Sequence, residues 1–255
     1  MPQNPSSVRS AIAALGGALQ SARHVCVLTG AGMSAESGVP TFRDAQSGLW
    51  AKYDPFELAT PEAFAANPER VWDWYQYRRK LVARAEPNRG HIALVELAAL
   101  VPELTLVTQN VDGLHQRAGS PDVIEFHGNL FENRCFAEGT VVQSVDSERL
   151  PYCPRCGSAV RPGVVWFGEN IPEAALERAS AGASACDLFL AIGTSAQVFP
   201  AAGLIDAARR AGATVAEINP QASGAVRDDD IQIAETAVSA LVPLVNRLTD
   251  PRTVD

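Results

Sequence analysis

The sequence predicts an α/β fold: a parallel β-sheet with helices on both faces, joined to a second, smaller domain. Short apolar runs of strand length alternate along the chain with segments of helical periodicity, and this alternation is typical of a parallel sheet that is buried on both sides. Two stretches interrupt the alternation. A chain of 255 residues with 47% hydrophobic content is long enough to bury one large core and one small one.

The first element expected is an amphipathic helix near the N-terminus. Apolar residues spaced by four, three and four positions share one helical face: Val8, Ile12, Leu15 and Leu19. Ser6 or Ser7 can cap this helix. An apolar stretch here could also be the core of an export signal, but it has no basic leader beyond Arg9. The interpretation is a packing helix that leads into the first strand.

Strands and helices then follow in alternation. Buried strands are expected at 24–29, 104–108, 123–126, 188–193 and 214–218. Helices are expected between or after them, at 92–100, 173–181, 201–211 and 237–248. Together these segments form the large domain.

The two interrupting stretches are 56–86, which is rich in helix formers and aromatic residues, and 133–160, which holds a cysteine motif and little apolar content. We expect both to belong to the small domain. The predicted division is 1–45, 87–131 and 161–248 for the large domain, 46–86 and 132–160 for the small one, and 249–255 for a tail.

Composition excludes several classes of protein. The net charge is −8 and there is no long block of Lys and Arg, so we expect no binding to nucleic acid. Five cysteines at irregular spacing argue against a secreted disulfide framework and favour the cytoplasm. The apolar stretches are interrupted before they reach membrane-spanning length, so no membrane partner is expected.

The first strand is followed by closely spaced glycines in the sequence GAGMSAESG, which begins at Gly30. A strand, then such glycines, then the start of a helix allows backbone N–H groups to meet a pyrophosphate. Taken alone, the pattern is equally consistent with a tight strand-to-helix turn.

The later strands are also followed by small or hydrogen-bonding residues. These segments read TQNVDG from Thr108, EFHG from Glu125, GTS from Gly193, and NP from Asn219. Because the carboxyl ends of parallel strands meet at one edge of the sheet, all of them reach the crevice where such sheets bind ligands. The sequence therefore predicts a ligand site at this edge.

These motifs, in this order, resemble the sirtuins, the NAD-dependent protein lysine deacylases. The resemblance rests on GAGMSAESGVPTFRD, TQNVDGLH, EFHG, a cysteine knuckle, GTS and INP, and it covers about residues 25–248. It implies a Rossmann-like NAD-binding large domain and a small domain with a helical module and a zinc-ribbon-like module. It also implies NAD as cofactor, acylated-lysine proteins as substrates, and nicotinamide and O-acyl-ADP-ribose as products. We expect a monomer.

The resemblance implies a set of residues around NAD. The loop from Thr41 to about residue 51 would fold over the cofactor, with Phe42 shielding the reactive centre. The implied NAD contacts are Gly30, Ala31, Gly32, Ala35, Thr41, Phe42, Arg43, Gln109, Asn110, Asp112, Gly193, Thr194, Ser195, Asn219 and Val238.

The resemblance also implies that His127 is the catalytic base, assisted by Asn110 and Asp112. Imidazole titrates near neutral pH, so it can accept the proton of a ribose hydroxyl. We expect the other three histidines to be structural: His24 in packing, and His91 and His115 in helix capping or loop packing.

The substrate peptide would dock on the segment VVWFGE at 164–169, with contacts from Val165, Phe167 and Gly168. An extended segment with exposed backbone suits the addition of a peptide strand. The alternative is a buried core strand.

A predicted helix at about 68–85 carries residues that bear on which acyl group the protein prefers. Val71, Tyr75, Arg78 and Val82 share one face, on which Arg78 is the charged member. Arg78 could reach solvent or a protein carboxylate. The sequence also resembles the sirtuin branch that prefers succinyl- and malonyl-lysine, which implies that Tyr75 and Arg78 bind the acyl carboxylate and that Ala59 leaves room for it. We expect this preference, with some deacetylation.

The cysteine motif departs from the sirtuin pattern. Sirtuins hold a structural zinc with four cysteines, and this chain has Cys135, Cys153 and Cys156, with Glu138 where the fourth is expected. A carboxylate can bind zinc. Asp146, Glu148 or water could also supply the fourth ligand, or the site could hold no metal. Cys26 and Cys186 are interpreted as buried small hydrophobes.

Other functions are compatible with parts of the pattern. An ordinary deacetylase, a protein ADP-ribosyltransferase and an NAD-sensing binding module would share the fold and the cofactor. Arg43, Asn110, Asp112 and His127 favour an active enzyme over a sensor, and the pair Tyr75 and Arg78 argues against ADP-ribosyl transfer.

Overall fold

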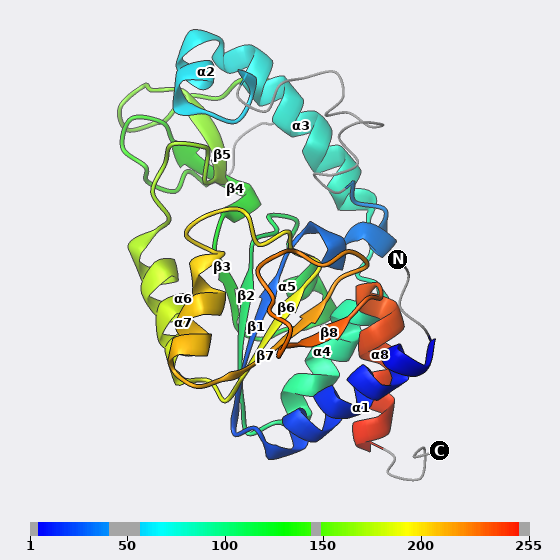
Figure 1. Ribbon diagram of the computed structural model, residues 1–255. Helices are drawn as coiled ribbons and strands as arrows, with labels where there is room; N and C mark the ends of the chain where they lie inside the picture. The colour runs from blue at the N-terminus through cyan, green and yellow to red at the C-terminus, as the bar shows by residue number, and fades with distance from the viewer. Residues whose placement is uncertain (1–4, 41–56, 144–148, 250–255) are drawn as a thin grey trace.

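The computed structural model describes residues 5–40, 57–143 and 149–249. Its main feature is a six-stranded parallel sheet with the strand order β3-β2-β1-β6-β7-β8 (Figure 1). The strands are β1 (His24–Thr29), β2 (Glu103–Thr108), β3 (Val123–Glu125), β6 (Leu188–Ile192), β7 (Thr214–Ile218) and β8 (Ile231–Ile233). The predicted α/β fold class is confirmed, and β8 is an addition to the expected strands.

Chain order reverses at β1, because β2 and β3 lie on one side of it and β6, β7 and β8 on the other. Sheets of this Rossmann-like order bind ligands outside the carboxyl ends of the strands, at the point of reversal. The loops after β1 and β6 are therefore placed at the expected ligand crevice.

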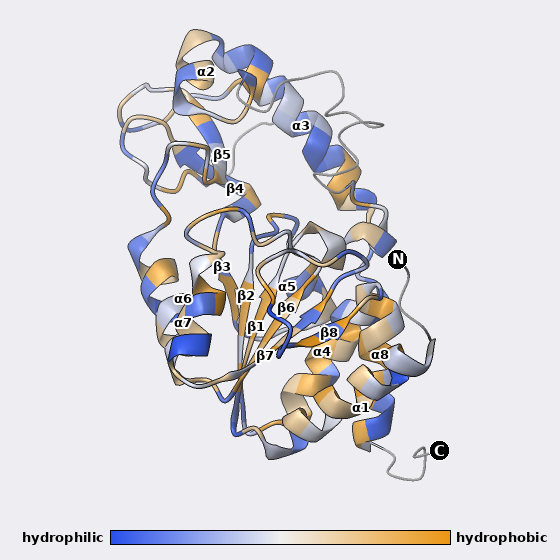
Figure 2. Cartoon of the chain, in the orientation of Figure 1, coloured by the Kyte–Doolittle hydropathy of each residue, from blue (hydrophilic) through white to orange (hydrophobic). Residues whose placement is uncertain are grey.

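Helices cover both faces of the sheet. The helices α1 (Pro5–Ser21), α4 (Arg89–Leu100) and α8 (Ala237–Thr249) pack on one face, and α6 (Glu173–Ala185) and α7 (Gly203–Arg210) pack on the other. Side chains of β1 alternate between these two layers, with Val25 and Val27 on the first and Cys26 and Leu28 on the second. The strands are accordingly apolar on both sides, as the colouring of Figure 2 shows.

The predicted face of the N-terminal helix is buried, and so are two of the cysteines. In α1, Leu15 and Leu19 lie in the first core layer, which confirms a packing helix. Cys26 and Cys186 lie in the second layer, as expected for small hydrophobes. Within the described residues, the structure contains no helix that is both long and apolar enough to cross a membrane.

A smaller unit stands at the carboxyl edge of the sheet (Figure 1). It contains α2 (Pro61–Ala66), α3 (Pro68–Arg84) and the antiparallel pair β4 (Gly128–Cys135) and β5 (Val160–Val164). Arg79 joins α3 to β4, because its guanidinium donates to the carbonyl oxygens of Leu130 at 2.6 Å and Glu132 at 2.9 Å. The division of the chain between the two domains stays a prediction. A short helix, α5 (Leu114–Ala118), follows β2.

Candidate active site

Two glycine loops meet at the point of strand-order reversal. The N–H of Gly32 donates to the carbonyl oxygen of Gly193 at 2.9 Å. A Cβ added at Gly32 would lie 2.7 Å from Gly193 Cα, and one at Gly193 would lie 2.6 Å from Gly32 C. Gly193 also has a φ of +58°, in the left-handed region. The two backbones are therefore in contact, which only glycine permits here.

The chain after Gly30 differs from the prediction. We expected an α-helix to start there, but Ala31–Met33 and Ala35–Ser37 form two short 3₁₀ turns. The N-terminus of a full α-helix is therefore not available to an anion at this point. In and after the first turn, the N–H groups of Gly32, Met33 and Ser34 already donate to backbone carbonyl oxygens.

Amide side chains join the loops after β2, β6 and β7. Gln109 Nε2 donates to Thr194 Oγ1 at 2.8 Å, and Asn219 Nδ2 donates to the Thr194 carbonyl oxygen at 2.8 Å. Thr194 and Asn219 are both buried. Ser195 follows directly, and Ala196 has a φ of +51°. The structure thus brings together three of the predicted NAD contacts in one rigid loop cluster.

Asn110 and Asp112 are linked through a serine that the sequence analysis missed. Asn110 Nδ2 donates to Ser34 Oγ at 3.1 Å, and Ser34 Oγ donates to Asp112 Oδ2 at 2.7 Å. Asn110 Nδ2 also donates to the carbonyl oxygen of Gly30 at 3.0 Å. Ser34 is buried. The position of Ser34 within the glycine motif could have suggested a role at the site. Its partner Asp112 could not be predicted, because it lies 78 positions away in the sequence.

Two buried histidines lie behind this network. His91 Nε2 is 3.5 Å from Ser34 Oγ, and the His91 and His115 rings are 4.9 Å apart between centroids. Burial lowers the pKa of His91 to about 4 and that of His115 to about 3. Both are therefore neutral at pH 7. His91 also completes the capping box of α4 with Asn88, which confirms its expected capping role.

His127 lies at the end of β3 with one ring nitrogen occupied. Its Nδ1 is 3.1 Å from the carbonyl oxygen of Gln109. Because a carbonyl oxygen only accepts hydrogen bonds, Nδ1 carries the proton and Nε2 offers its lone pair. Burial lowers the pKa of His127. A neutral imidazole in this tautomer is suited to act as a base.

Gly128, the residue after His127, allows the backbone to pack closely against the neighbouring strand β5. It has a φ of +79°, and an added Cβ would lie 2.1 Å from the carbonyl oxygen of Gly163. The segment after β5 is also hydrogen bonded to His127, because the N–H of Val165 donates to the carbonyl oxygen of His127 at 2.8 Å. The candidate base is thus directly connected to the segment expected to bind peptide.

That segment is less extended than predicted. We expected 164–169 to be an extended segment with exposed backbone, with a buried core strand as the alternative. In the structure, the buried strand β5 ends at Val164, and a turn follows at Phe167 and Gly168. Its cause is local: Gly168 has a φ of +85°, and the N–H of Glu169 donates to the carbonyl oxygen of Trp166 at 3.0 Å. Phe167 is 38% exposed and Val165 is half-buried.

The residues expected to line an acyl pocket lie around Trp166. Tyr75 is 2% exposed, and its hydroxyl accepts from Trp166 Nε1 at 2.8 Å. The N–H of Phe167 donates to the carbonyl oxygen of Ala59 at 3.0 Å. Val71, Tyr75 and Val82 share one buried cluster, which confirms the predicted helical face.

Arg78 is half-buried on this face. Its guanidinium carbon lies 5.0 Å from the ring centroid of Trp74 and 5.7 Å from that of Tyr75. Burial lowers the pKa of Arg78, while Tyr75 and Asp112 favour its charged form.

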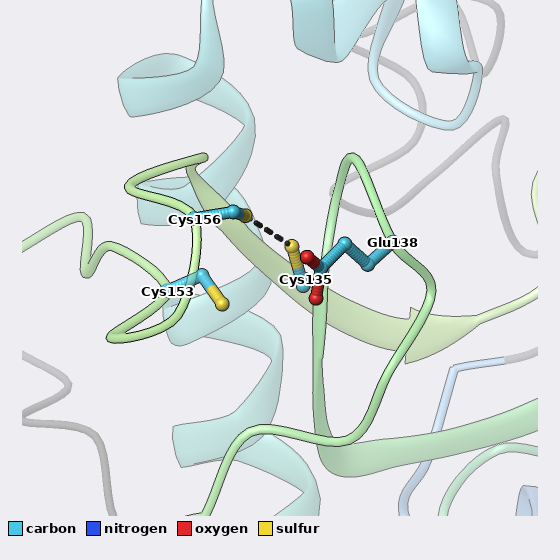
Figure 3. A group of neighbouring side chains, drawn as sticks. All are labelled: Cys135, Glu138, Cys153 and Cys156. Atoms are coloured by element: carbon cyan, nitrogen blue, oxygen red, sulfur yellow. Dashed lines mark hydrogen bonds between the residues drawn. The ribbon is translucent and has the colours of Figure 1, made fainter.

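The cysteines form a compact cluster with the glutamate (Figure 3). One ligand atom each from Cys135, Glu138, Cys153 and Cys156 lies within 4.8 Å of every other. The sulfur atoms of Cys135 and Cys156 are 3.4 Å apart. Three sulfurs and one carboxylate oxygen at this spacing fit a tetrahedral zinc ion. Asp146 and Glu148 lie outside the described residues.

Glu138 has a second partner besides the cysteines. Its Oε2 is 3.4 Å from Nη2 of Arg155, in the turn between Cys153 and Cys156. A surface pair of this kind contributes little to stability, but it directs the carboxylate toward the knuckle.

Some of the remaining predicted NAD contacts lie in the part of the chain that the structure describes, and others lie outside it. Val238 lies half-buried in the first turn of α8, and Ala35 is exposed in the second 3₁₀ turn. Thr41, Phe42 and Arg43 lie outside the described residues.

Comparison with known proteins indicates the family. The model of the Sir2 family matches residues 30–200. A protein of Methylococcus capsulatus named NAD-dependent protein deacylase is 54% identical over 212 residues, covering 79% of this chain and 83% of the relative. One of the same name from Aquifex aeolicus is 46% identical over 230 residues, covering 89% and 96%.

Solved structures agree with this match. The crystal structure of a Sir2 homologue in complex with NAD superposes with a TM-score of 0.86 and is 41% identical, covering 93% of each chain. A variant of a Sir2 homologue in complex with ADP-ribose gives a TM-score of 0.88 at 40% identity, covering 95% of this chain and 98% of that one.

Proposed function

We infer, because this chain belongs to the Sir2 family, that it is an NAD-dependent protein deacylase that removes acyl groups from lysine side chains. The resemblance to sirtuins is confirmed by the family match. The observation that carries the catalytic assignment is His127, a neutral histidine at a strand end with Nε2 available and with a backbone bond to Val165. Proteins with acylated lysines are the proposed substrates.

NAD fits the carboxyl edge of the sheet. The Gly32 and Gly193 backbones are in contact there, with no space for a Cβ on either residue, so the chain closes tightly at the point where such sheets bind dinucleotides. The amide side chains of Gln109 and Asn219 lie beside this contact. When bound, NAD supplies the ADP-ribose that accepts the acyl group as nicotinamide leaves. The pyrophosphate and adenosine end would be held by Gly193, Thr194, Ser195, Asn219 and Val238.

The chain's own residues then orient groups and move one proton. Asn110 and Asp112, held through Ser34, would orient the nicotinamide end. His127 Nε2 accepts the proton of a ribose hydroxyl as the acyl group is transferred, a role worth roughly 10²–10⁴-fold in rate. The carbonyl oxygen of Gln109 stabilises the imidazolium that forms, through Nδ1.

We propose further that the enzyme favours succinyl- and malonyl-lysine. Arg78 and Tyr75 are the groups that would bind the acyl carboxylate, and the small side chain of Ala59 leaves space for it. Charge-assisted hydrogen bonds are worth about 1.5–3 kcal/mol each. Two such bonds would shift the preference by tens to hundreds of fold, without excluding acetyl-lysine.

The test is a series of matched acetyl-, malonyl- and succinyl-lysine peptides, assayed by nicotinamide release. Arg78→Met should lose the preference for acidic acyl groups and keep deacetylation. Arg84→Met, an exposed arginine in the last turn of the same helix, is the matched control and should keep the preference. Equal turnover of all three peptides by the unmodified enzyme would refute the acyl preference.

A second candidate is an ordinary deacetylase, favoured by the attraction between Arg78 and Asp112. In that case Arg78 is a partner for a protein carboxylate. Arg78→Met would then change the turnover of acetyl- and succinyl-lysine peptides by the same factor.

We also propose that the cysteine cluster binds a structural zinc ion through Cys135, Cys153, Cys156 and Glu138. The proposal is supported by the close approach of all four ligand atoms. A structural zinc stabilises the fold without meeting substrate, and the three cysteine thiols would lose their protons and bind the metal as thiolates.

A further inference from the structure

The buried hydrogen bond between Trp166 and Tyr75 connects two parts of the proposed substrate site. It joins α3 to the segment after β5, between residues 91 positions apart in sequence. Both side chains are 2% exposed. Trp166 stands between Val165 and Phe167, the two residues proposed to contact the peptide. The bond therefore links the peptide segment to the acyl pocket.

The bonds around the Tyr75 hydroxyl determine where its proton points. A tyrosine hydroxyl has one proton to donate and two lone pairs that accept, whereas indole and guanidinium groups only donate. Trp166 Nε1 donates to this oxygen at 2.8 Å, and the Arg78 guanidinium carbon lies 5.7 Å from the Tyr75 ring centroid. Because the indole N–H engages a lone pair of this oxygen, the hydroxyl proton of Tyr75 is directed away from Trp166, toward another acceptor. An ionised carboxylate, which only accepts, is the matching partner.

Trp166 is itself held on several sides. The guanidinium carbon of Arg161 lies 3.4 Å from the Trp166 ring centroid, and the backbone N–H of Trp166 donates to Glu169 Oε2 at 2.8 Å. Arg161 contacts both carboxylate oxygens of Glu169. Phe64 packs at 5.3 Å between ring centroids. An indole fixed in this way keeps its N–H directed before substrate arrives, so binding costs less conformational entropy.

We propose that Trp166 is a positioning residue for acyl specificity: its indole N–H orients the Tyr75 hydroxyl so that the hydroxyl proton faces the carboxylate of a succinyl or malonyl group. The inference rests on the proposed function and adds a residue that does not itself touch the acyl group. An acetyl group has no carboxylate, so its turnover does not use this bond.

The test compares Trp166→Phe, which removes the N–H and keeps an aromatic ring, with the unmodified enzyme. The ratio of kcat/KM for succinyl- over acetyl-lysine peptide should fall about three- to tenfold. The change should lie mainly in KM for the succinyl peptide, because the carboxylate contact is the same in ground and transition states. In a Tyr75→Phe background the same substitution should change the ratio by less than about twofold.

Trp72→Phe is the matched control, because Trp72 is a fully buried tryptophan of α3 that packs against Arg79 and the cysteine cluster. It should leave the acyl ratio unchanged. The proposal is overturned if Trp166→Phe lowers kcat/KM for both peptides by one factor, or lowers the ratio equally in the Tyr75→Phe background. An unmodified enzyme without acyl preference would instead refute the proposed function.

A measurement on the unmodified protein does not depend on any variant folding. The indole N–H resonance of Trp166 should shift further with succinyl-lysine peptide than with acetyl-lysine peptide, because the carboxylate strengthens the chain of hydrogen bonds. Equal shifts with the two peptides would overturn the proposal.

Discussion

At the carboxyl edge of the large sheet, two loops meet backbone against backbone, whereas in the small unit the candidate functional groups are side chains that meet across separate elements. Gly32 and Gly193 leave no space for a Cβ. In contrast, Tyr75, Arg78 and Trp166 depend on the packing of α3 against the segment after β5.

This difference separates recognition of the cofactor pyrophosphate from recognition of the acyl group. A pyrophosphate is recognised by backbone N–H groups and needs close approach of the main chain, so this region tolerates little change. An acyl group is recognised by side chains, which can be exchanged while the fold is kept. Substitutions should therefore abolish function or stability at the sheet edge, and should shift specificity or metal affinity in the small unit.

The largest effect is expected at the base. His127→Ala should lower kcat by about 10²–10⁴-fold, because it removes the group proposed to take up the ribose proton. Single-turnover assays with NAD and an acylated peptide would measure this loss. His24→Gln, at the opposite end of β1, is the control and should leave kcat unchanged. A loss below tenfold for His127→Ala would count against its role.

Gly193→Ala tests the contact between the loops. The new Cβ would meet the backbone of Gly32 and Met33 at 2.6 Å in a left-handed conformation. We expect the free energy of unfolding to fall by about 2–4 kcal/mol, from overpacking and backbone strain together. Gly212→Ala shares the positive φ and has nothing within 4 Å, so it should cost only about 1 kcal/mol. Equal losses in urea titrations would contradict the contact argument.

The buried histidines predict a dependence of stability on pH. The pKa of His91, about 4, and that of His115, about 3, are below the value of the unfolded chain. Between pH 6.5 and 4 the unfolded state therefore binds more protons, and stability falls as pH falls. Each histidine should cost roughly 1 kcal/mol between pH 6.5 and 5.5.

Urea titrations at several pH values would measure this loss. His115→Phe should remove the share of the dependence that His115 contributes, while His91 and His127, whose pKa values burial also lowers, continue to titrate. An unfolding free energy that stays constant down to pH 5 would show that neither ring is held neutral.

The smallest effect on turnover is expected at the cysteine cluster. Glu138→Ala should weaken zinc binding on the order of tenfold in chelator competition, and Glu138→Cys should strengthen it, since thiolate is the softer ligand. Deacylation with zinc in excess should change by less than about twofold, because the site does not meet substrate. Glu177→Ala, an exposed residue of α6, is the control. Equal zinc affinity for both Glu138 variants would remove Glu138 from the ligand set.

Several parts of the fold and the candidate site were predictable from local pattern. The strand at His24–Thr29 was expected with its observed bounds, because a run of buried residues bounded by glycine is a short-range signal. The face shared by Tyr75 and Val82 follows from helical spacing alone. The turn at Phe167 and Gly168 was missed, because the apolar run before it continues the strand pattern.

The sequence by itself determined the α/β class, the glycine loops, the helical face with Arg78 and the cysteine knuckle, since each depends on residues within one or two turns of chain. The tertiary structure decided which of these groups meet. Ser34 bridges Asn110 and Asp112, Gly193 rests on Gly32, and Trp166 binds Tyr75 only because strand order reverses at β1 and α3 packs on the segment after β5. Contacts between residues more than 70 positions apart depend on that packing, which no local periodicity encodes.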